Sequence, residues 1–179
     1  MEMTRREFMK SVGAASLAVA AAGLLSGCSG GDVIASANGI NDVANMDQIK
    51  MTVRSLSYGY DSNGTLYVVP EVLLNNGTAA GIPVAPENGR FRLSVNGTLD
   101  MNINEETMAF LKKNKSWNAV DSRTLNRGQY EQGHLCGTLQ NAPAFNYVYV
   151  IFYPNPYDTK TYLRCKISKS EANSIIVAS

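Results

Sequence analysis

The residues of this chain whose types and spacing could perform chemistry are His134 and Cys136. His134 is the one histidine, and residues two apart in a β-strand project from the same side. An imidazole beside a thiol can lower the thiol pKa, and a lone histidine can serve a hydrolase as its base. A packed or hydrogen-bonded histidine is the alternative. The spacing of Cys136 and Cys165 does not fit a zinc site, so we predict no metal and no cofactor.

The first 27 residues have the composition of an export signal. Arg5, Arg6 and Lys10 supply a basic start, and residues 12–25 supply an apolar stretch rich in alanine and glycine. This stretch is shorter than the ~20 residues that a membrane-spanning helix needs. A cleaved segment is therefore favoured over a permanent span.

Two motifs in this segment resemble known bacterial signals. The spacing of Arg5, Arg6, Phe8 and Lys10 resembles the twin-arginine export signal. A receptor recognises this signal. The segment Leu25-Ser26-Gly27-Cys28 resembles the lipobox of bacterial lipoproteins. This resemblance implies cleavage before the cysteine, over residues 1–27, and a lipid on the Cys28 sulfur; two or three chains suffice for stable anchoring. An ordinary N-terminus and an unlipidated cysteine are the alternatives.

An exported setting makes a disulfide the expected state of the other two cysteines. Because Cys28 is reserved for lipid and disulfides persist outside the cytoplasm, we predict that Cys136 and Cys165 pair. Closing a loop of this length stabilises a fold by ~3–4 kcal/mol in the chain-entropy model. Two buried free thiols are the alternative.

Cleavage before Cys28 would leave a chain without net charge. It removes three of the 16 basic and two of the 15 acidic residues, which leaves 13 of each. Without a basic surplus we expect no nucleic-acid partner. The remaining length suits one domain, since domains usually have about 100–150 residues.

The mature chain divides into a tether and a strand-rich domain. Residues 28–47 are rich in serine, glycine, alanine and asparagine and keep no period, which favours a flexible coil. Over residues 48–179, short segments alternate apolar and polar residues between turn signals. The predicted strands are residues 49–60, 65–74, 90–95, 98–101, 130–139, 145–153 and 162–168.

Four local features have a physical reason that can be read from the sequence. A change of parity near Arg54 indicates a one-residue bulge. Pro70 lacks an N–H, so it should lie on a free edge or at a bulge. Asn96-Gly97 predicts a tight hairpin because both residues tolerate positive φ. Asn104 can cap a short helix over residues 104–115, which has glutamates at its start and lysines at its end.

One predicted strand carries tyrosines on a single face. Tyr147, Tyr149 and Tyr153 recur on one side of residues 145–153. Tyrosine offers a broad amphipathic contact surface at low entropic cost, which suits recognition of a partner or a sugar. The alternative is that these rings pack beneath the predicted helix.

The strand and turn pattern resembles the telokin-like, immunoglobulin-fold lipoprotein domains of bacteria. The likeness rests on residues 64–76, 91–93 and 125–135, behind a lipobox and a low-complexity segment. It implies an all-β, immunoglobulin-like β-sandwich of about seven strands with one short helix inserted. It brings no catalytic residue with it.

These observations predict a non-enzymatic binding or adaptor module on the extracytoplasmic side of the cell envelope. Its expected partners are the membrane, through a lipid on Cys28, and another envelope protein or a glycan. One alternative is an accessory subunit of an exported redox enzyme, because twin-arginine export carries folded, often cofactor-loaded cargo. Another is a hydrolase that uses His134.

Overall fold

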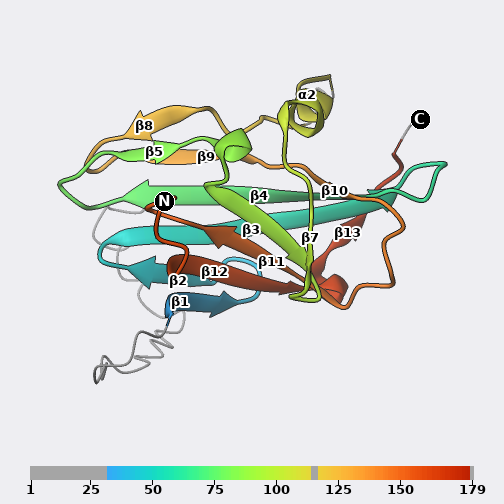
Figure 1. Ribbon diagram of the computed structural model, residues 1–179, viewed down its shortest axis with the longest axis horizontal. Helices are drawn as coiled ribbons and strands as arrows, with labels where there is room; N and C mark the ends of the chain where they lie inside the picture. Colours follow the sequence, from blue (N-terminus) through green and yellow to red (C-terminus); the bar gives the residue numbers. More distant parts are fainter. Residues whose placement is uncertain (1–31, 114–116, 178–179) are drawn as a thin grey trace, which may run out of the picture. The chain divides into compact units, whose positions relative to one another are not determined.

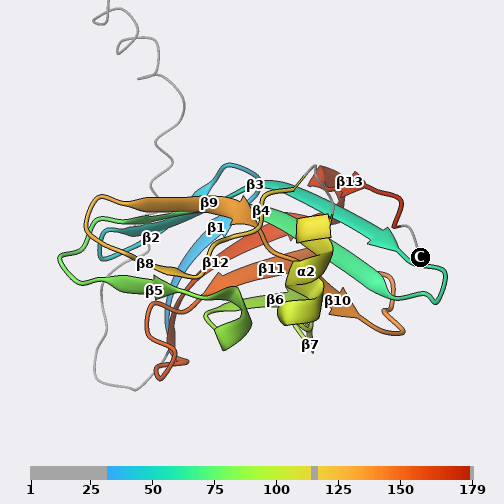
Figure 2. The ribbon, with the colours of Figure 1, turned by 90° about the horizontal axis from the view of Figure 1, so that it is seen from above.

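A computed structural model describes residues 32–113 and 117–177, which form two β-sheets packed face to face (Figure 1, Figure 2). The all-β sandwich with one short α-helix that the sequence predicts is confirmed. The predicted export signal and the lipidation residue Cys28 lie outside the described residues.

The first sheet, sheet A, has five strands in the order β1-β12-β11-β6-β7. β1 runs parallel to β12, and every other pair of neighbours is antiparallel. The bounds of its strands are β1 (Val33–Asn38), β6 (Phe91–Val95), β7 (Leu99–Asp100), β11 (Tyr147–Phe152) and β12 (Thr161–Ser168).

The second sheet, sheet B, is built on the long hairpin of β3 and β4. β2 and β13 pair with β3, and β9 and β10 pair with β4. The bounds are β2 (Val43–Met46), β3 (Ile49–Tyr60), β4 (Leu66–Asn76), β9 (Tyr130–His134), β10 (Gly137–Leu139) and β13 (Asn173–Ser174).

Five short elements complete the described residues. β5 and β8 pair as a small third sheet. The helix α2 is the one expected after Asn104, whose side-chain Oδ1 accepts the Thr107 N–H at 2.9 Å. The bounds are β5 (Ile82–Val84), β8 (Arg123–Leu125), α2 (Glu105–Lys113) and the 3₁₀ turns η1 (Pro86–Asn88) and η2 (Lys169–Glu171).

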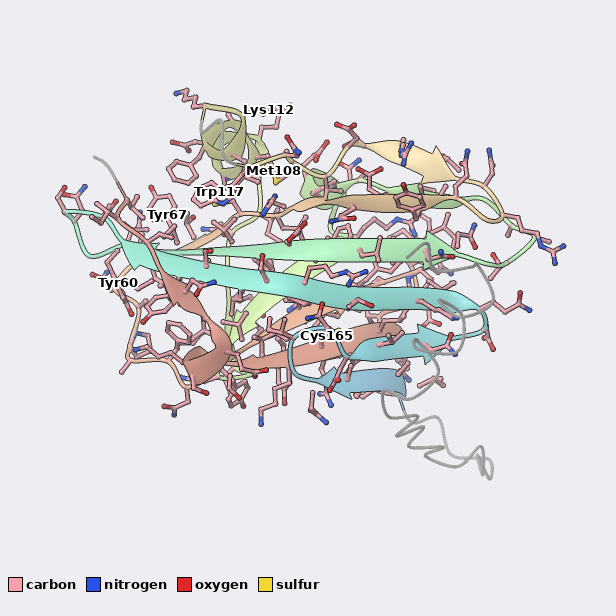
Figure 3. The ribbon with its side chains drawn as sticks, turned by 180° about the vertical axis from the view of Figure 1, so that it is seen from behind. Tyr60, Tyr67, Met108, Lys112, Trp117 and Cys165 are labelled. Atoms are coloured by element: carbon pink, nitrogen blue, oxygen red, sulfur yellow. The ribbon has the colours of Figure 1, made fainter. Side chains whose placement is uncertain are left out.

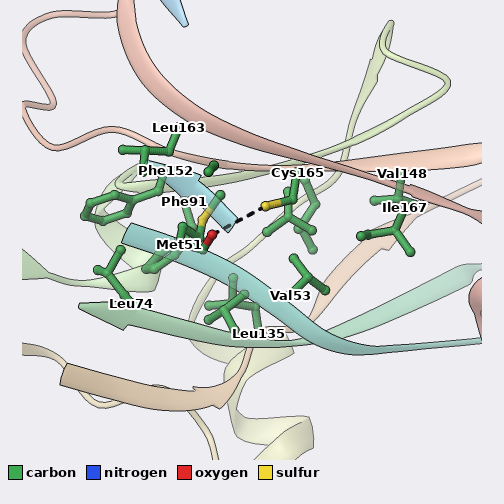
Figure 4. Packing of buried hydrophobic residues seen from close by; sticks show 14 of the residues in the cluster. Met51, Val53, Leu74, Phe91, Leu135, Val148, Phe152, Leu163, Cys165 and Ile167 are labelled. Carbon is green, nitrogen blue, oxygen red and sulfur yellow. Dashed lines mark hydrogen bonds between the residues drawn. The ribbon is translucent and has the colours of Figure 1, made fainter. Parts of the chain in front are cut away.

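The core lies between the inner faces of sheets A and B (Figure 4). Alternation along the strands places every second side chain there, because successive residues of a strand point to opposite faces. β11 contributes Val148, Val150 and Phe152, and β12 contributes Leu163 and Ile167, all fully buried. Burying one such side chain stabilises a fold by about 1.5–3 kcal/mol.

Two predicted irregularities are present, and Pro70 lies neither on a free edge nor at a bulge but in the internal strand β4, beside the gap between β9 and β10. The register between β3 and β4 shifts between Val53 and Ser55, which leaves Arg54 as the bulge residue. Asn96 and Gly97 have φ of 52° and 75° in the β6–β7 hairpin. Pro70 lies where the predicted strand 130–139 divides into β9 and β10, and its carbonyl accepts the Leu135 N–H at 3.0 Å.

Residues 33–46 do not form the flexible tether that the sequence predicts. β1 pairs with β12 over six residues, and β2 pairs with β3 over four. A hydrophobic period does not reveal these strands because the side chains they bury are mostly small: Ala37, Ala44 and Met46. The folded domain therefore includes β1 rather than beginning at residue 48.

We predict that a chain comprising residues 48–179 is much less stable than one comprising residues 32–179. Removing β1 and β2 takes Met46 and two buried alanines from the core and leaves β12 as an open sheet edge. The expected loss in the free energy of unfolding is about 3 kcal/mol or more. Urea unfolding followed by circular dichroism measures it; equal midpoints for the two chains would show that residues 33–46 do act as a tether.

Candidate functional site

His134 and Cys136 do not form the reactive pair that their spacing suggests. β9 ends at His134 and β10 begins at Gly137, so the two residues do not belong to one continuous strand. Burial raises the pKa of the Cys136 thiol to about 12, which is opposite to the activation of a nucleophile. The thiol therefore stays protonated and unreactive at neutral pH.

His134 is held as a structural histidine. Its Nδ1 lies 3.1 Å from the Asn118 carbonyl oxygen, and its ring lies 6.3 Å from that of Trp117. Glu71 faces it across the β4–β9 pair, but that carboxylate accepts hydrogen bonds from Ser55 at 3.3 Å and Gln132 at 2.8 Å. In the described part of the chain, no serine hydroxyl forms a hydrogen bond with the His134 ring. The histidine therefore has no serine nucleophile to activate, as a hydrolase would need.

The predicted disulfide between Cys136 and Cys165 is wrong, because sheet B separates the two thiols. Both residues are free and buried. Cys165 lies in the main core, where its thiol donates to the Met51 carbonyl at 3.8 Å. Cys136 lies on the other side of sheet B, in a cluster with Val69 and Met108.

The helix α2 packs against part of that outer side of sheet B (Figure 3). Met108 packs with Val69 of β4, and aromatic rings extend the cluster: Phe110 lies 5.1 Å from Tyr67 and 5.9 Å from Trp117. The predicted tyrosine surface of β11 is not part of this cluster. The alternative that Tyr147 and Tyr149 pack beneath the helix is therefore wrong.

The tyrosines of β11 lie on the outer face of sheet A, where they are accompanied by cations. Tyr147, Tyr149 and Tyr162 keep part of their surface exposed, whereas Tyr153 is 8% exposed. We call this surface the tyrosine face. It comprises Arg92, Ser94, Tyr147, Tyr149, Ile151, Tyr153, Tyr162, Arg164 and Lys166.

The Asn96-Gly97 hairpin fixes the orientation of two of these rings. The Tyr147 hydroxyl donates to the Asn96 carbonyl at 2.8 Å, and the Asn146 N–H donates to the Asn96 side chain at 2.9 Å. A Cβ on Gly97 would lie 3.0 Å from the Tyr149 ring and 3.1 Å from the Tyr147 hydroxyl. Glycine at this position therefore allows both the turn and the close approach of the rings.

Cations from the neighbouring strand β12 cover the ring faces. The Arg164 guanidinium lies 4.6 Å from the Tyr149 ring centroid, and the Lys166 ammonium lies 4.3 Å from that of Tyr147. Such contacts stabilise by about 0.5–1 kcal/mol at exposed sites. They also hold long cationic side chains in fixed positions on the tyrosine face.

Two hollows open on this side of the molecule and share Arg92, Tyr153 and Thr159. One has a volume of about 220 Å³ and is bordered by Tyr149, Arg164 and other residues of the tyrosine face. The other has a volume of about 430 Å³ and extends past β7 towards η1. The two hollows therefore lie next to each other at one side of sheet A.

Ser94 lies in the wall of the smaller hollow and is chemically unusual. It is 3% exposed, and its hydroxyl has no hydrogen-bond partner among the described residues. Buried hydroxyls are nearly always paired, because an unpaired one loses its bonds to water. Its neighbours across the sheet are Tyr149 and Asp100.

The sequence predicts the three tyrosines of this site but not their partners. Arg92 and Ser94 lie on β6 and Arg164 lies on β12, and only the strand order brings them beside β11. Asp32, which also borders the smaller hollow, lies in the segment predicted to be a tether. No helix among the described residues is long and apolar enough to cross a membrane.

No protein-family model matches the chain, and no curated protein matches it in sequence. One similar solved structure is that of a "putative lipoprotein" from Bacillus subtilis, with 18% identity, a TM-score of 0.53 and coverage of 72% of this chain and 38% of that one. Another is a β-sandwich protein from Clostridium difficile, with 7% identity, a TM-score of 0.41 and coverage of 79% and 97%.

The likeness to the Bacillus subtilis structure concerns the β-sandwich fold alone. This chain corresponds to 38% of the length of that protein. At 18% identity, neither its location nor any activity is transferred by the comparison. The fold hosts many functions, so function must be argued from the tyrosine face itself.

We predict that residues 32–179 contain two free thiols that are protected in the folded state. Unfolded in guanidinium without reductant, this chain should react with two equivalents of a thiol reagent. Folded at neutral pH it should react slowly, because burial raises the pKa of Cys136 to about 12 and that of Cys165 to about 11. A Cys136→Ala variant provides the control, with one equivalent. If the unfolded chain did not react with the thiol reagent, the two cysteines would be joined in a disulfide after all.

Proposed function

We propose that this protein is a lipid-anchored, non-enzymatic binding module of the bacterial cell envelope, and that it recognises its partner through the tyrosine face. One observation carries the proposal: aromatic rings, fixed cations and an unpaired buried hydroxyl converge on one open sheet face. On the outer face of sheet B, α2 packs against a part that includes Val69 and Cys136.

The geometry of the tyrosine face suits binding better than catalysis. Tyr147 and Tyr149 pack edge to face with their centroids 5.0 Å apart, and cations from β12 hold them in place. Rigid aromatic side chains of this kind provide contact area at little entropic cost. Arg92 is already paired with Asp100 at 2.6 Å, so it shapes the two hollows rather than moving a proton.

The anchor and the route of export are argued from the N-terminal sequence. The lipobox-like Leu25-Ser26-Gly27-Cys28 supplies a residue for lipid attachment, and the Arg5-Arg6 pair supplies a twin-arginine signal. The resemblance to telokin-like lipoprotein domains is consistent with this arrangement. In this proposal the folded domain works on the extracytoplasmic side of the membrane.

Replacing Cys28 tests the anchor. In a bacterial host that exports the full chain, the wild-type protein should fractionate with membranes, and its mature N-terminus should be a lipidated Cys28. Cys28→Ser should move the protein to the soluble fraction, because the acyl chains supply the membrane affinity. Ser29→Ala is the matched control and should remain with membranes.

An intact Met1 by mass spectrometry, or a Cys28→Ser protein that still sediments with membranes, would contradict the anchor. Neither result depends on what the domain binds.

Binding to isolated cell envelopes tests the tyrosine face. Residues 32–179 should sediment with envelope fragments from the source bacterium, and Tyr149→Ala should reduce the bound fraction about tenfold, since one anchoring aromatic residue commonly contributes that much. Tyr130→Ala is the matched control, because that side chain is 59% exposed on β9 of the other sheet.

The melting temperature of each variant separates binding from folding. Tyr149 is partly exposed, so its replacement should lower the melting temperature only slightly. A large fall would assign the ring to the core, and equal envelope binding by the two variants would exclude the tyrosine face. Cross-linking that captured an exported oxidoreductase would favour the accessory-subunit alternative.

A further inference from the structure

We infer that one end of sheet A rests on the lipid headgroups of the membrane. The contact surface, which we call the sheet A tip, comprises Val33 and Ile34 at the start of β1 and Tyr157 in the loop between β11 and β12. This inference rests on the proposed function, because it starts from the lipid on Cys28. It adds a second, weaker contact with the bilayer, which the folded domain itself makes.

The two segments of the sheet A tip lie side by side. β1 pairs in parallel with β12, and Val33 lies opposite Thr161, the first residue of β12. The Val33 N–H donates to the Lys160 carbonyl at 2.7 Å, so the start of β1 is hydrogen-bonded to the loop that carries Tyr157. Both segments therefore belong to one end of the sheet, and Figure 1 shows this end opposite the one where β3 terminates.

The side chains of the sheet A tip are exposed although they are apolar or amphipathic. Val33 is 53% exposed, Ile34 is 38% exposed and Tyr157 is 96% exposed. A tyrosine at the membrane surface places its ring at the level of the headgroups and keeps its hydroxyl in water. The two aliphatic side chains add apolar area to the same contact. The tip therefore has the residue types that an interfacial contact with lipid needs.

The charges of the sheet A tip balance. Its carboxylates are Asp32, which precedes β1, and Asp158, whose side chain accepts the Lys160 N–H at 3.0 Å. Its cations are Lys160 and Arg90, which donates to the Tyr153 carbonyl at 3.3 Å. Basic clusters draw a protein to anionic lipid, and this end has no such surplus. The contact is therefore expected on a zwitterionic bilayer as well.

The proposed anchor makes a weak contact sufficient. Val33 is five residues after Cys28, a stretch that spans at most ~18 Å when fully extended. A tether of this length keeps the tip at an effective concentration of about a millimolar at the bilayer. Ile176 is 98% exposed as well, but it follows β13, which pairs near the far end of β3. Exposure and the path of the anchor coincide at the sheet A tip.

Quenching by brominated lipid tests this contact in the lipidated full-length protein. Trp117 is the one tryptophan of the chain, so Trp117→Phe removes all native tryptophan emission. In that background, Tyr157→Trp reports on the tip. After reconstitution into phosphatidylcholine vesicles, bromine on the acyl chains should lower its emission about twofold, because the ring lies at the level of the headgroups. Adding phosphatidylglycerol should not increase the quenching.

Tyr60→Trp in the same background is the matched control. Tyr60 is 41% exposed and is the last residue of β3, at the opposite end of the domain, so its emission should hardly change. A further variant separates the native contact from the affinity of the introduced tryptophan. Val33→Thr with Ile34→Thr keeps the branched shape that strands favour. In the Tyr157→Trp protein, this pair should reduce the quenching by about half, since it removes apolar contact area.

Equal quenching of Tyr157→Trp and Tyr60→Trp in the lipidated protein would overturn this inference and leave the anchor intact. Quenching of Tyr157→Trp that the two threonine substitutions leave unchanged would also overturn it, because the introduced tryptophan would then account for the signal. Mass spectrometry of the same preparation reports on Cys28. A protein without lipid there would overturn the proposed anchor and this inference together.

Discussion

The burial of every second residue of β11 determines both the interior of this domain and its outer surface. Val148, Val150 and Phe152 are fully buried between the sheets, and the two-residue period of a strand then places Tyr147 and Tyr149 outside. A shift of one residue in register would move the rings into the core and the core residues out. The position of the tyrosine face is therefore maintained by the stability of the whole sandwich.

The outer surface is further shaped by contacts from three neighbouring segments. The β6–β7 hairpin receives the Tyr147 hydroxyl at 2.8 Å and leaves room for the ring of Tyr149 at Gly97. β12 places Arg164 over Tyr149, and β6 places Ser94 beside it. These residues come from distant parts of the chain, so the tyrosine face exists only when sheet A is assembled.

Sequence patterns predicted the parts of this fold that depend on local physics. The bulge at Arg54, the Asn96-Gly97 turn and the start of α2 follow from parity, positive φ and capping, and all are present. The sequence did not predict β1 and β2 as strands, because their buried residues are mostly alanines, which hardly stand out from polar residues in a hydrophobic pattern. The disulfide failed because sequence does not tell which side of sheet B a cysteine occupies. The two hollows depend on strand order, which one sequence does not reveal.

If Cys28 carries the proposed lipid, the position of β1 limits how far the domain can stand from the bilayer. Asp32 borders the smaller hollow and is four residues after the proposed lipid-bearing Cys28. Fully extended, that stretch spans at most ~14 Å. With the anchor proposed above, the smaller hollow would lie close to the lipid headgroups.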